Sequence, residues 1–246
     1  MSMIDLSTTI APGPDLEITY RDHSNGAKMI ESMFQVPSNL LRNGEGWAVE
    51  EFTRFSTHGS THIDAPWHYN SEIEDQRSQT VDELPLEWFF NDGVVLEMRH
   101  KPDGDPVTVD DVRQELERIG YTLKPLDIVL VRTGRDEFYG QPDYPAKGCG
   151  VTAEATRWLF EQGIRVMGID SWGWDCPLQL QAEKAVNQQA AGIFWAAHQA
   201  GVQYSQIERL VNLAPLPHFG FKVACFPLKI KGGSGAPARV VAILDE

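Results

Sequence analysis

His58-Gly59-Ser60-Thr61-His62-Ile63-Asp64-Ala65-Pro66-Trp67-His68 is the segment that says most about the architecture and chemistry of this chain. It contains three of the seven histidines, together with one aspartate. Imidazole nitrogens and carboxylate oxygens are good ligands for zinc, manganese or iron, and a catalytic metal site needs about three protein ligands and one position for water. The segment therefore predicts that His58, His62 and Asp64 bind a divalent metal ion.

The residues around these ligands predict how the backbone presents them. A strand beginning near Trp47 would end at His58, and Gly59-Ser60 would turn the chain back. In the extended segment that follows, the two-residue period places His62 and Asp64 on one face. Pro66 would end the strand pairing and bring His68 round as a fourth polar group.

Composition indicates a single α/β domain over residues 1–246, because this length can bury a substantial core. The net charge of −14 argues against nucleic acid and anionic membrane surfaces as partners. No apolar run approaches the ~20 residues that span a bilayer, and the N-terminus does not resemble a signal peptide, so we expect a cytoplasmic location. The three cysteines are far apart in sequence and odd in number, which is typical of reduced packing residues.

Alternating strands and helices predict an α/β fold with a mixed sheet and flanking helices. Short segments rich in β-branched residues predict the strands, while capping residues and glycines mark the helix ends. Residues 20–46 are weakly periodic and carry scattered apolar side chains, so we expect a lid or a dimer-contacting arm. The predicted strands are 93–98, 128–132, 166–169, 221–230 and 239–244, and the predicted helices follow Thr108, follow Thr152 and cover 188–200.

The last of these helices matters for the site. Phe194 and His198 are four residues apart, so on a helix they would share a face and His198 could point into a pocket. Glu208 is expected to begin a further short helix. Two tryptophans, Trp172 and Trp174, follow a predicted buried strand, where loops of α/β folds commonly meet ligands.

The 58–68 segment resembles the His-x-Gly-Thr-His-x-Asp-x-Pro-x-His signature of the cyclase-like metal-dependent hydrolases, the family of bacterial kynurenine formamidase and isatin hydrolase. Glycine is displaced by one position here, but every proposed ligand keeps its spacing. The resemblance extends to segments 4–7, 168–170, 226–230 and 238–243, and so covers nearly the whole chain. It implies a swivelling β/β/α fold and the hydrolysis of an amide, lactam or lactone bond in a small substrate.

The resemblance also implies roles for single residues. His68 matches the histidine that transfers protons in the family. His198 and Glu208 lie where family members place a His and a Glu as additional metal ligands or proton-transfer groups, although their separation is shorter here. The implied cofactor is one Zn²⁺ or Mn²⁺ ion, with a second ion bridged by Asp64 as the alternative.

The substrate is less well defined by the sequence. Aromatic side chains near the motif and in the predicted arm would suit an aromatic or cyclic substrate. The resemblance and the predicted arm together favour a homodimer or homotetramer. The candidate substrate contacts are Trp67, Trp172, Trp174, Tyr20 and Phe34.

Two other functions fit part of this pattern. His62 and Asp64, with a distant His198 or His218, would also form the facial triad of a non-haem iron(II) oxygenase. That enzyme class predicts a jelly-roll of many short strands, whereas this sequence alternates strands with helices. The third hypothesis is a non-catalytic metal-binding module with a saturated coordination shell.

Overall fold

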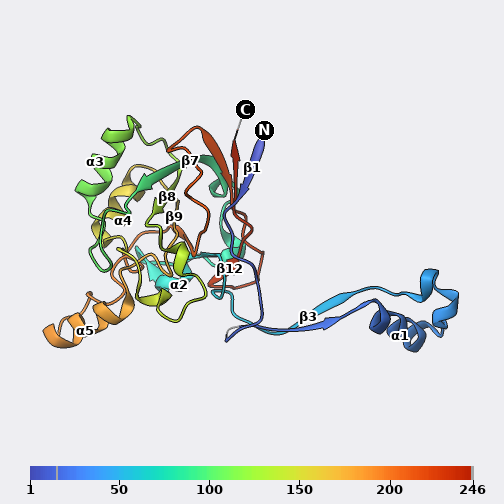
Figure 1. Ribbon diagram of the computed structural model, residues 1–246. Helices are drawn as coiled ribbons and strands as arrows, with labels where there is room; N and C mark the ends of the chain where they lie inside the picture. The colour runs from blue at the N-terminus through green and yellow to red at the C-terminus, as the bar shows by residue number, and fades with distance from the viewer. Residues whose placement is uncertain (15, 245–246) are drawn as a thin grey trace. The chain divides into compact units, whose positions relative to one another are not determined.

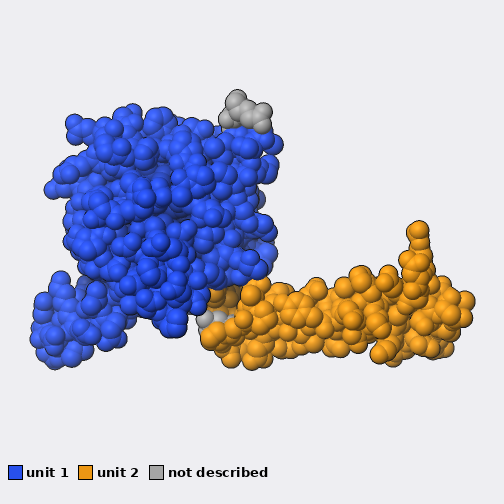
Figure 2. Space-filling view, in the orientation of Figure 1, with its two compact units in different colours: residues 1–9, 60–246 blue, residues 10–59 orange. Residues whose placement is uncertain are grey.

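The computed structural model describes residues 1–14 and 16–244. The chain divides into two compact units, coloured separately in Figure 2: residues 1–9 with 60–246, and residues 10–59. The first unit holds the large sheet and most of the predicted site residues.

The 10–59 unit is a two-stranded antiparallel ribbon with a helix between its strands. Strands β2 (Leu16–Arg21) and β3 (Val49–Phe55) pair with each other. Helix α1 (His23–Phe34) begins after Asp22, whose carboxylate accepts the backbone N–H of Asn25 and so satisfies one donor of the first turn. Short 3₁₀ turns at Ser38–Leu40 and Arg42–Gly44 lead back to β3. The predicted arm, residues 20–46, lies within this unit.

The larger unit is built on one nine-stranded mixed sheet, in the order β1-β13-β11-β7-β8-β9-β10-β4-β12. The four strands β7 to β10 run parallel, and the other pairs in the sheet are antiparallel. The predicted α/β class with a mixed sheet is therefore confirmed. The strands are β1 (Ser2–Asp5), β4 (His62–Asp64), β7 (Phe90–Glu97), β8 (Ile128–Arg132), β9 (Val166–Ile169), β10 (Ser205–Glu208), β11 (Phe221–Ala224), β12 (Gly235–Pro237) and β13 (Val241–Leu244).

Helices α3 (Val109–Ile119) and α4 (Ala153–Glu161) cover one face of the parallel strands (Figure 1). Val94 and Leu96 of β7 pack in the same buried cluster as Leu116 of α3 and Leu159 of α4. Helix α3 has the predicted capping box, in which Thr108 and Asp111 satisfy each other's backbone N–H groups, and it ends at Gly120 in the left-handed region (φ 68°).

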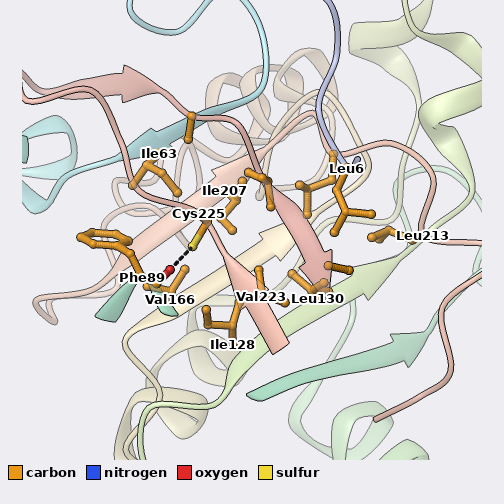
Figure 3. Close-up of a cluster of buried hydrophobic side chains, with 14 of the residues drawn as sticks. Leu6, Ile63, Phe89, Ile128, Leu130, Val166, Ile207, Leu213, Val223 and Cys225 are labelled. Carbon is orange, nitrogen blue, oxygen red and sulfur yellow. Dashed lines mark hydrogen bonds between the residues drawn. The ribbon is translucent and has the colours of Figure 1, made fainter. Parts of the chain in front are cut away.

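The opposite face of the sheet curls over a second buried cluster (Figure 3). Val95, between Val94 and Leu96, points into this cluster, as strand alternation requires. Ile63 of β4 and Ile207 of β10 belong to the same cluster as Ile128 of β8 and Val223 of β11. Burial on both faces explains why the parallel strands read as continuous apolar segments.

The remaining elements of this unit are short, apart from one helix. None of the helices in residues 1–14 and 16–244 is both long and apolar enough to cross a bilayer. The elements are helices α2 (Pro66–Tyr69) and α5 (Leu178–Gln188), the hairpin of β5 (Glu72–Ile73) and β6 (Gln76–Arg77), and 3₁₀ turns at Val81–Glu83, Leu86–Trp88, Arg135–Phe138 and Tyr144–Ala146.

The predicted helix over 188–200 is wrong. Helix α5 ends at Gln188, and residues 189–200 form successive turns in which Trp195 has a positive φ of 63°. Side chains take over the bonding that a helix would provide. Gln181 accepts the backbone N–H of Trp195, and the Asp175 carboxylate accepts those of Ala197 and His198. Phe194 and His198 therefore do not share a helical face.

Two further expectations differ from the structure. Glu208 ends strand β10 rather than beginning a helix, because its segment pairs with both β9 and β4. The strand expected over 221–230 ends at Ala224, and Pro227, which has no N–H to donate, makes only an isolated bridge to Ala238. The strands predicted at 128–132 and 166–169 are confirmed with the same bounds.

Candidate metal centre

The candidate site is built on two adjacent antiparallel strands, β4 and β10. Each carries a polar residue on either side of an isoleucine, as His62-Ile63-Asp64 and Gln206-Ile207-Glu208. The register places Asp64 opposite Gln206 and His62 opposite Glu208, with the two isoleucines opposite each other. Strand alternation turns both isoleucines into the core, so the four polar side chains share the other face.

This polar face is buried. Asp64, His62 and Gln206 have no exposed surface, and Glu208 is only 6% exposed. Two carboxylates out of water require compensation by a cation or by hydrogen bonds. The burial therefore favours a site that holds positive charge.

Three of these groups converge. His62 Nε2 lies 3.2 Å from Asp64 Oδ1 and 3.6 Å from Glu208 Oε2. Ligand atoms of all three residues lie within 4.8 Å of one another, which suits coordination of one ion. One imidazole nitrogen and two carboxylate oxygens form a donor set that zinc and manganese both accept. His62 Nδ1 lies 2.6 Å from the carbonyl oxygen of Ser60, a contact that orients the ring with Nε2 toward the carboxylates.

His198 reaches the same face from the turns that follow α5. Its Nδ1 lies 2.6 Å from the Asp175 carboxylate, which also accepts its backbone N–H. Its Nε2 lies 3.4 Å from Glu208 Oε1 and 3.9 Å from Asp64 Oδ2. The structure therefore brings His62, Asp64, His198 and Glu208 together.

The loop that carries Asp175 is held by close backbone packing. Gly150 has a φ of +61°, and a Cβ there would lie 2.4 Å from the Asp175 carbonyl carbon. Only glycine allows this approach at a positive φ. The N–H of Val151 also donates to the carbonyl of Trp174. These backbone contacts hold Asp175 in the position from which it binds His198.

The carboxylates raise the pKa of both buried imidazoles. Burial acts to lower the pKa of His198, but the hydrogen bonds to Asp175 and Glu208 outweigh it and raise the pKa to about 9. Burial also acts to lower the pKa of His62, and the charge of Asp64 raises it above its usual value. A coordinated divalent cation would reverse this, because only the neutral imidazole binds a metal.

His68, the fourth polar group of the motif, lies in helix α2 beside this cluster. Its ring centroid is 5.9 Å from that of His198 and 5.1 Å from that of Trp195, which it meets edge-on. Trp195 stacks on His198 at 4.5 Å, with an angle of 24° between the ring planes. A ring nitrogen of His68 also lies within 4.8 Å of an Asp64 carboxylate oxygen, so His68 borders the cluster on the Asp64 side.

His58 belongs to the 10–59 unit, four residues before His62 in the chain. Its Nδ1 lies 2.8 Å from Thr57 Oγ1. Its role as a ligand stays a prediction from its position in the motif.

The aromatic candidates occupy different environments. Trp67 of α2 is 39% exposed, and Trp172 is half-buried beneath the Arg209 guanidinium, 5.0 Å from its ring centroid. Trp174 is fully buried and donates its indole N–H to Thr156, which makes it a core residue. Tyr20 and Phe34 are largely exposed side chains of the 10–59 unit.

The sequence analysis assigned no role to Gln206 or Trp195, and the contact of Asp175 with His198 was not predicted. Gln206 Nε2 lies within hydrogen-bonding distance of Asp64, His198 and Glu208. The signal for Gln206 was present, because Gln206-Ile207-Glu208 repeats the alternation of His62-Ile63-Asp64. Asp175 and Trp195 reach the site through irregular turns, which have no periodicity to detect.

Comparison with known proteins places these features in a family. The Cyclase family model, described as "Putative cyclase", matches residues 4–176. Isatin hydrolase A from Labrenzia aggregata, bound to benzyl benzoate, is 26% identical with a TM-score of 0.73, covering 100% of this chain and 94% of that chain.

Two more distant structures share the fold. Isatin hydrolase A from Ralstonia solanacearum is 24% identical with a TM-score of 0.75, covering 99% of this chain and 92% of that chain. A potential metal-dependent hydrolase with cyclase activity is 21% identical with a TM-score of 0.62, covering 100% of this chain and 98% of that chain. Taken with the candidate ligand cluster, these similarities support a metal-dependent hydrolase.

Proposed function

The chain belongs to the Cyclase family, and from this premise we propose that it is a metal-dependent hydrolase that opens an amide, lactam or lactone bond of a small cyclic or aromatic substrate. The observation that carries the proposal is the buried convergence of His62, Asp64 and Glu208. The name of the similar isatin hydrolase suggests the substrate class. The iron(II) oxygenase alternative gains no support, because the sheet is mixed and flanked by helices rather than a jelly-roll.

In this proposal, one Zn²⁺ or Mn²⁺ ion is held by His62, Asp64 and Glu208, with His58 as the further ligand predicted from the motif. A divalent ion in such a site lowers the pKa of bound water toward about 7 and polarises a substrate carbonyl. The donor set fits this role, because it combines imidazole and carboxylate and lies on rigid, paired strands.

The chain's own residues supply proton transfer and orientation. His68 takes a proton from the attacking water and returns it to the leaving nitrogen or oxygen, a task suited to imidazole. His198 is oriented by Asp175 and faces both carboxylates, so it keeps them in position. Trp195 lies against both histidine rings and shields them from solvent on one side.

Substrate contacts are proposed for the aromatic side chains with accessible surface. Trp67 and Trp172 are the candidates within the larger unit. Tyr20 and Phe34, which belong to the 10–59 unit, stay candidates predicted from the sequence. Trp174 is instead expected to support the loop that carries Asp175.

We also propose that the protein forms a homodimer or homotetramer through the 10–59 unit. This unit exposes large apolar side chains, including Met33, Phe34 and Phe52, and such patches commonly mark interfaces. Light scattering on the wild type and on a Met33→Glu/Phe34→Glu double variant would test this. Unchanged mass in the double variant would argue against the arm as the interface.

The direct test of function is an assay on purified protein loaded with Zn²⁺ or Mn²⁺. Elemental analysis should find bound metal, and N-formylkynurenine, isatin and simple lactones should be compared as substrates. Hydrolysis of at least one, lost on chelation and restored by metal, is the expected result. A protein that binds no divalent ion would refute the proposal.

A further inference from the structure

The two buried carboxylates of the centre each face in two directions. Asp64 Oδ1 and Glu208 Oε2 lie toward His62 Nε2, at 3.2 and 3.6 Å. Asp64 Oδ2 and Glu208 Oε1 lie toward Gln206 Nε2, at 3.1 and 3.2 Å. Both carboxylates therefore have one oxygen at the proposed metal position and one at the amide of Gln206.

The surroundings of this amide are those expected of a second cation. His198 Nε2 lies 2.6 Å from Gln206 Nε2, which adds an imidazole nitrogen to the two carboxylate oxygens. In two-metal hydrolytic sites the ions are about 3.5–4 Å apart and are commonly bridged by shared ligands. The position taken by the Gln206 amide is lined by one imidazole nitrogen and by one oxygen from each of two carboxylates, a donor set that would suit such an ion.

The orientation of the amide is fixed by its neighbours. Gln206 Oε1 accepts a hydrogen bond from the Tyr204 hydroxyl at 3.0 Å. His198 Nδ1 lies 2.6 Å from Asp175. When a divalent cation is bound and the ring is neutral, its one proton is on Nδ1 toward Asp175, and Nε2 is an acceptor. Two carboxylates and an acceptor nitrogen thus surround the NH₂ end of the amide, whereas the reversed orientation would place oxygen against oxygen.

From this arrangement we infer that Gln206 restricts the centre to a single metal ion by occupying the second cation position with its amide NH₂ group. This inference rests on the proposed function, because it concerns the same centre. The two amide N–H groups partly compensate the carboxylate charge without bringing a second full charge into the core. Because the amide is covalently part of the chain and uncharged, it fills this position whether or not metal is present.

The test is the number of ions bound per chain. Wild-type protein is saturated with Mn²⁺, freed of excess metal and measured by elemental analysis, and electron paramagnetic resonance is used to detect coupling between ions. Gln206→Ala removes the amide, and Gln206→Glu keeps its shape but replaces the donor with a carboxylate oxygen. Gln179→Ala, at an exposed position of helix α5, is the matched control.

We expect about one ion per chain in the wild type and the control, and about two in both Gln206 variants, with a coupled Mn²⁺ spectrum only in the variants. Circular dichroism establishes that each variant is folded. Two ions in the wild type would overturn the inference directly, whether or not the variants fold. One ion in every folded variant would overturn it while leaving the proposed function intact, whereas no ion in any protein would remove the proposed function as well.

Discussion

Replacement of Asp175 should destabilise the protein measurably, because this carboxylate holds a non-helical segment in place. It accepts three hydrogen bonds: from the backbone N–H of Ala197 at 3.0 Å, from that of His198 at 2.9 Å and from His198 Nδ1 at 2.6 Å. Asp175 is 8% exposed, so water replaces it poorly as an acceptor. Asp175→Ala removes all three acceptor contacts at once.

The size of the effect follows from these contacts. A buried donor left unsatisfied costs about 1–3 kcal/mol, so three donors give about 3–9 kcal/mol. Two effects reduce this sum. The desolvation cost of the carboxylate disappears with the side chain, and a cavity of about 520 Å³ that Asp175 lines lets water reach part of the segment. We therefore expect a net loss of about 2–4 kcal/mol in the free energy of unfolding.

Urea unfolding of chelator-treated protein, followed by tryptophan fluorescence, measures this loss without a contribution from bound metal. Asp175→Asn keeps one acceptor oxygen and should lose about half as much. Asp143→Ala, at an exposed position, is the control and should change stability by less than about 0.5 kcal/mol. A loss below about 1 kcal/mol in Asp175→Ala would show that the segment is held by other contacts.

His68→Ala should keep its metal content but lose most turnover. His100→Ala, at an exposed position, is the control. Equal loss of metal and turnover in His68→Ala would contradict separate roles for the metal ligands and the proton-transfer residue. Ile63→Ala should cost about 2–4 kcal/mol in urea unfolding, because Ile63 is fully buried opposite Ile207; a value near zero would mean that the curled core collapses around the change. Burial raises the pKa of Asp170 to about 6, above its unfolded value. The folded state therefore holds the extra proton, so stability should fall by up to about 3 kcal/mol as pH rises from about 4 to about 6, and Asp170→Asn should flatten this dependence. Chelation should lower the melting temperature and metal should restore it, since an ion at 100 times its Kd adds about 2.7 kcal/mol; an unchanged melting temperature would mean that the folded state binds no metal tightly.

Local patterns were sufficient wherever the structure depends on near neighbours. The β-branched segments 128–132 and 166–169 form strands with those bounds, because both faces of the sheet bury them. Thr108 caps the N-terminus of helix α3 and Gly120 caps its C-terminus, as their capping chemistry predicts. The alternation in His62-Ile63-Asp64 placed both polar side chains on one face of β4.

Local patterns failed where distant groups replaced local hydrogen bonds. Residues 189–200 have helical spacing, but the side chains of Asp175 and Gln181 take their backbone N–H groups. Glu208 was expected to begin a helix, but it lies in strand β10. The strand was missed because its pairing partners, β9 and β4, are remote in sequence. No local propensity reports such pairings.

The sequence by itself determined the chemistry of the centre. It showed which strand carries an imidazole and a carboxylate on one face, and it showed that these groups suit a divalent ion. Only the tertiary structure decided the composition of the centre, because it pairs β4 with β10 and so brings Gln206 against Asp64 across 142 residues of chain. Strand alternation is a local property of the backbone, whereas the choice of a pairing partner depends on burying both isoleucines in one core.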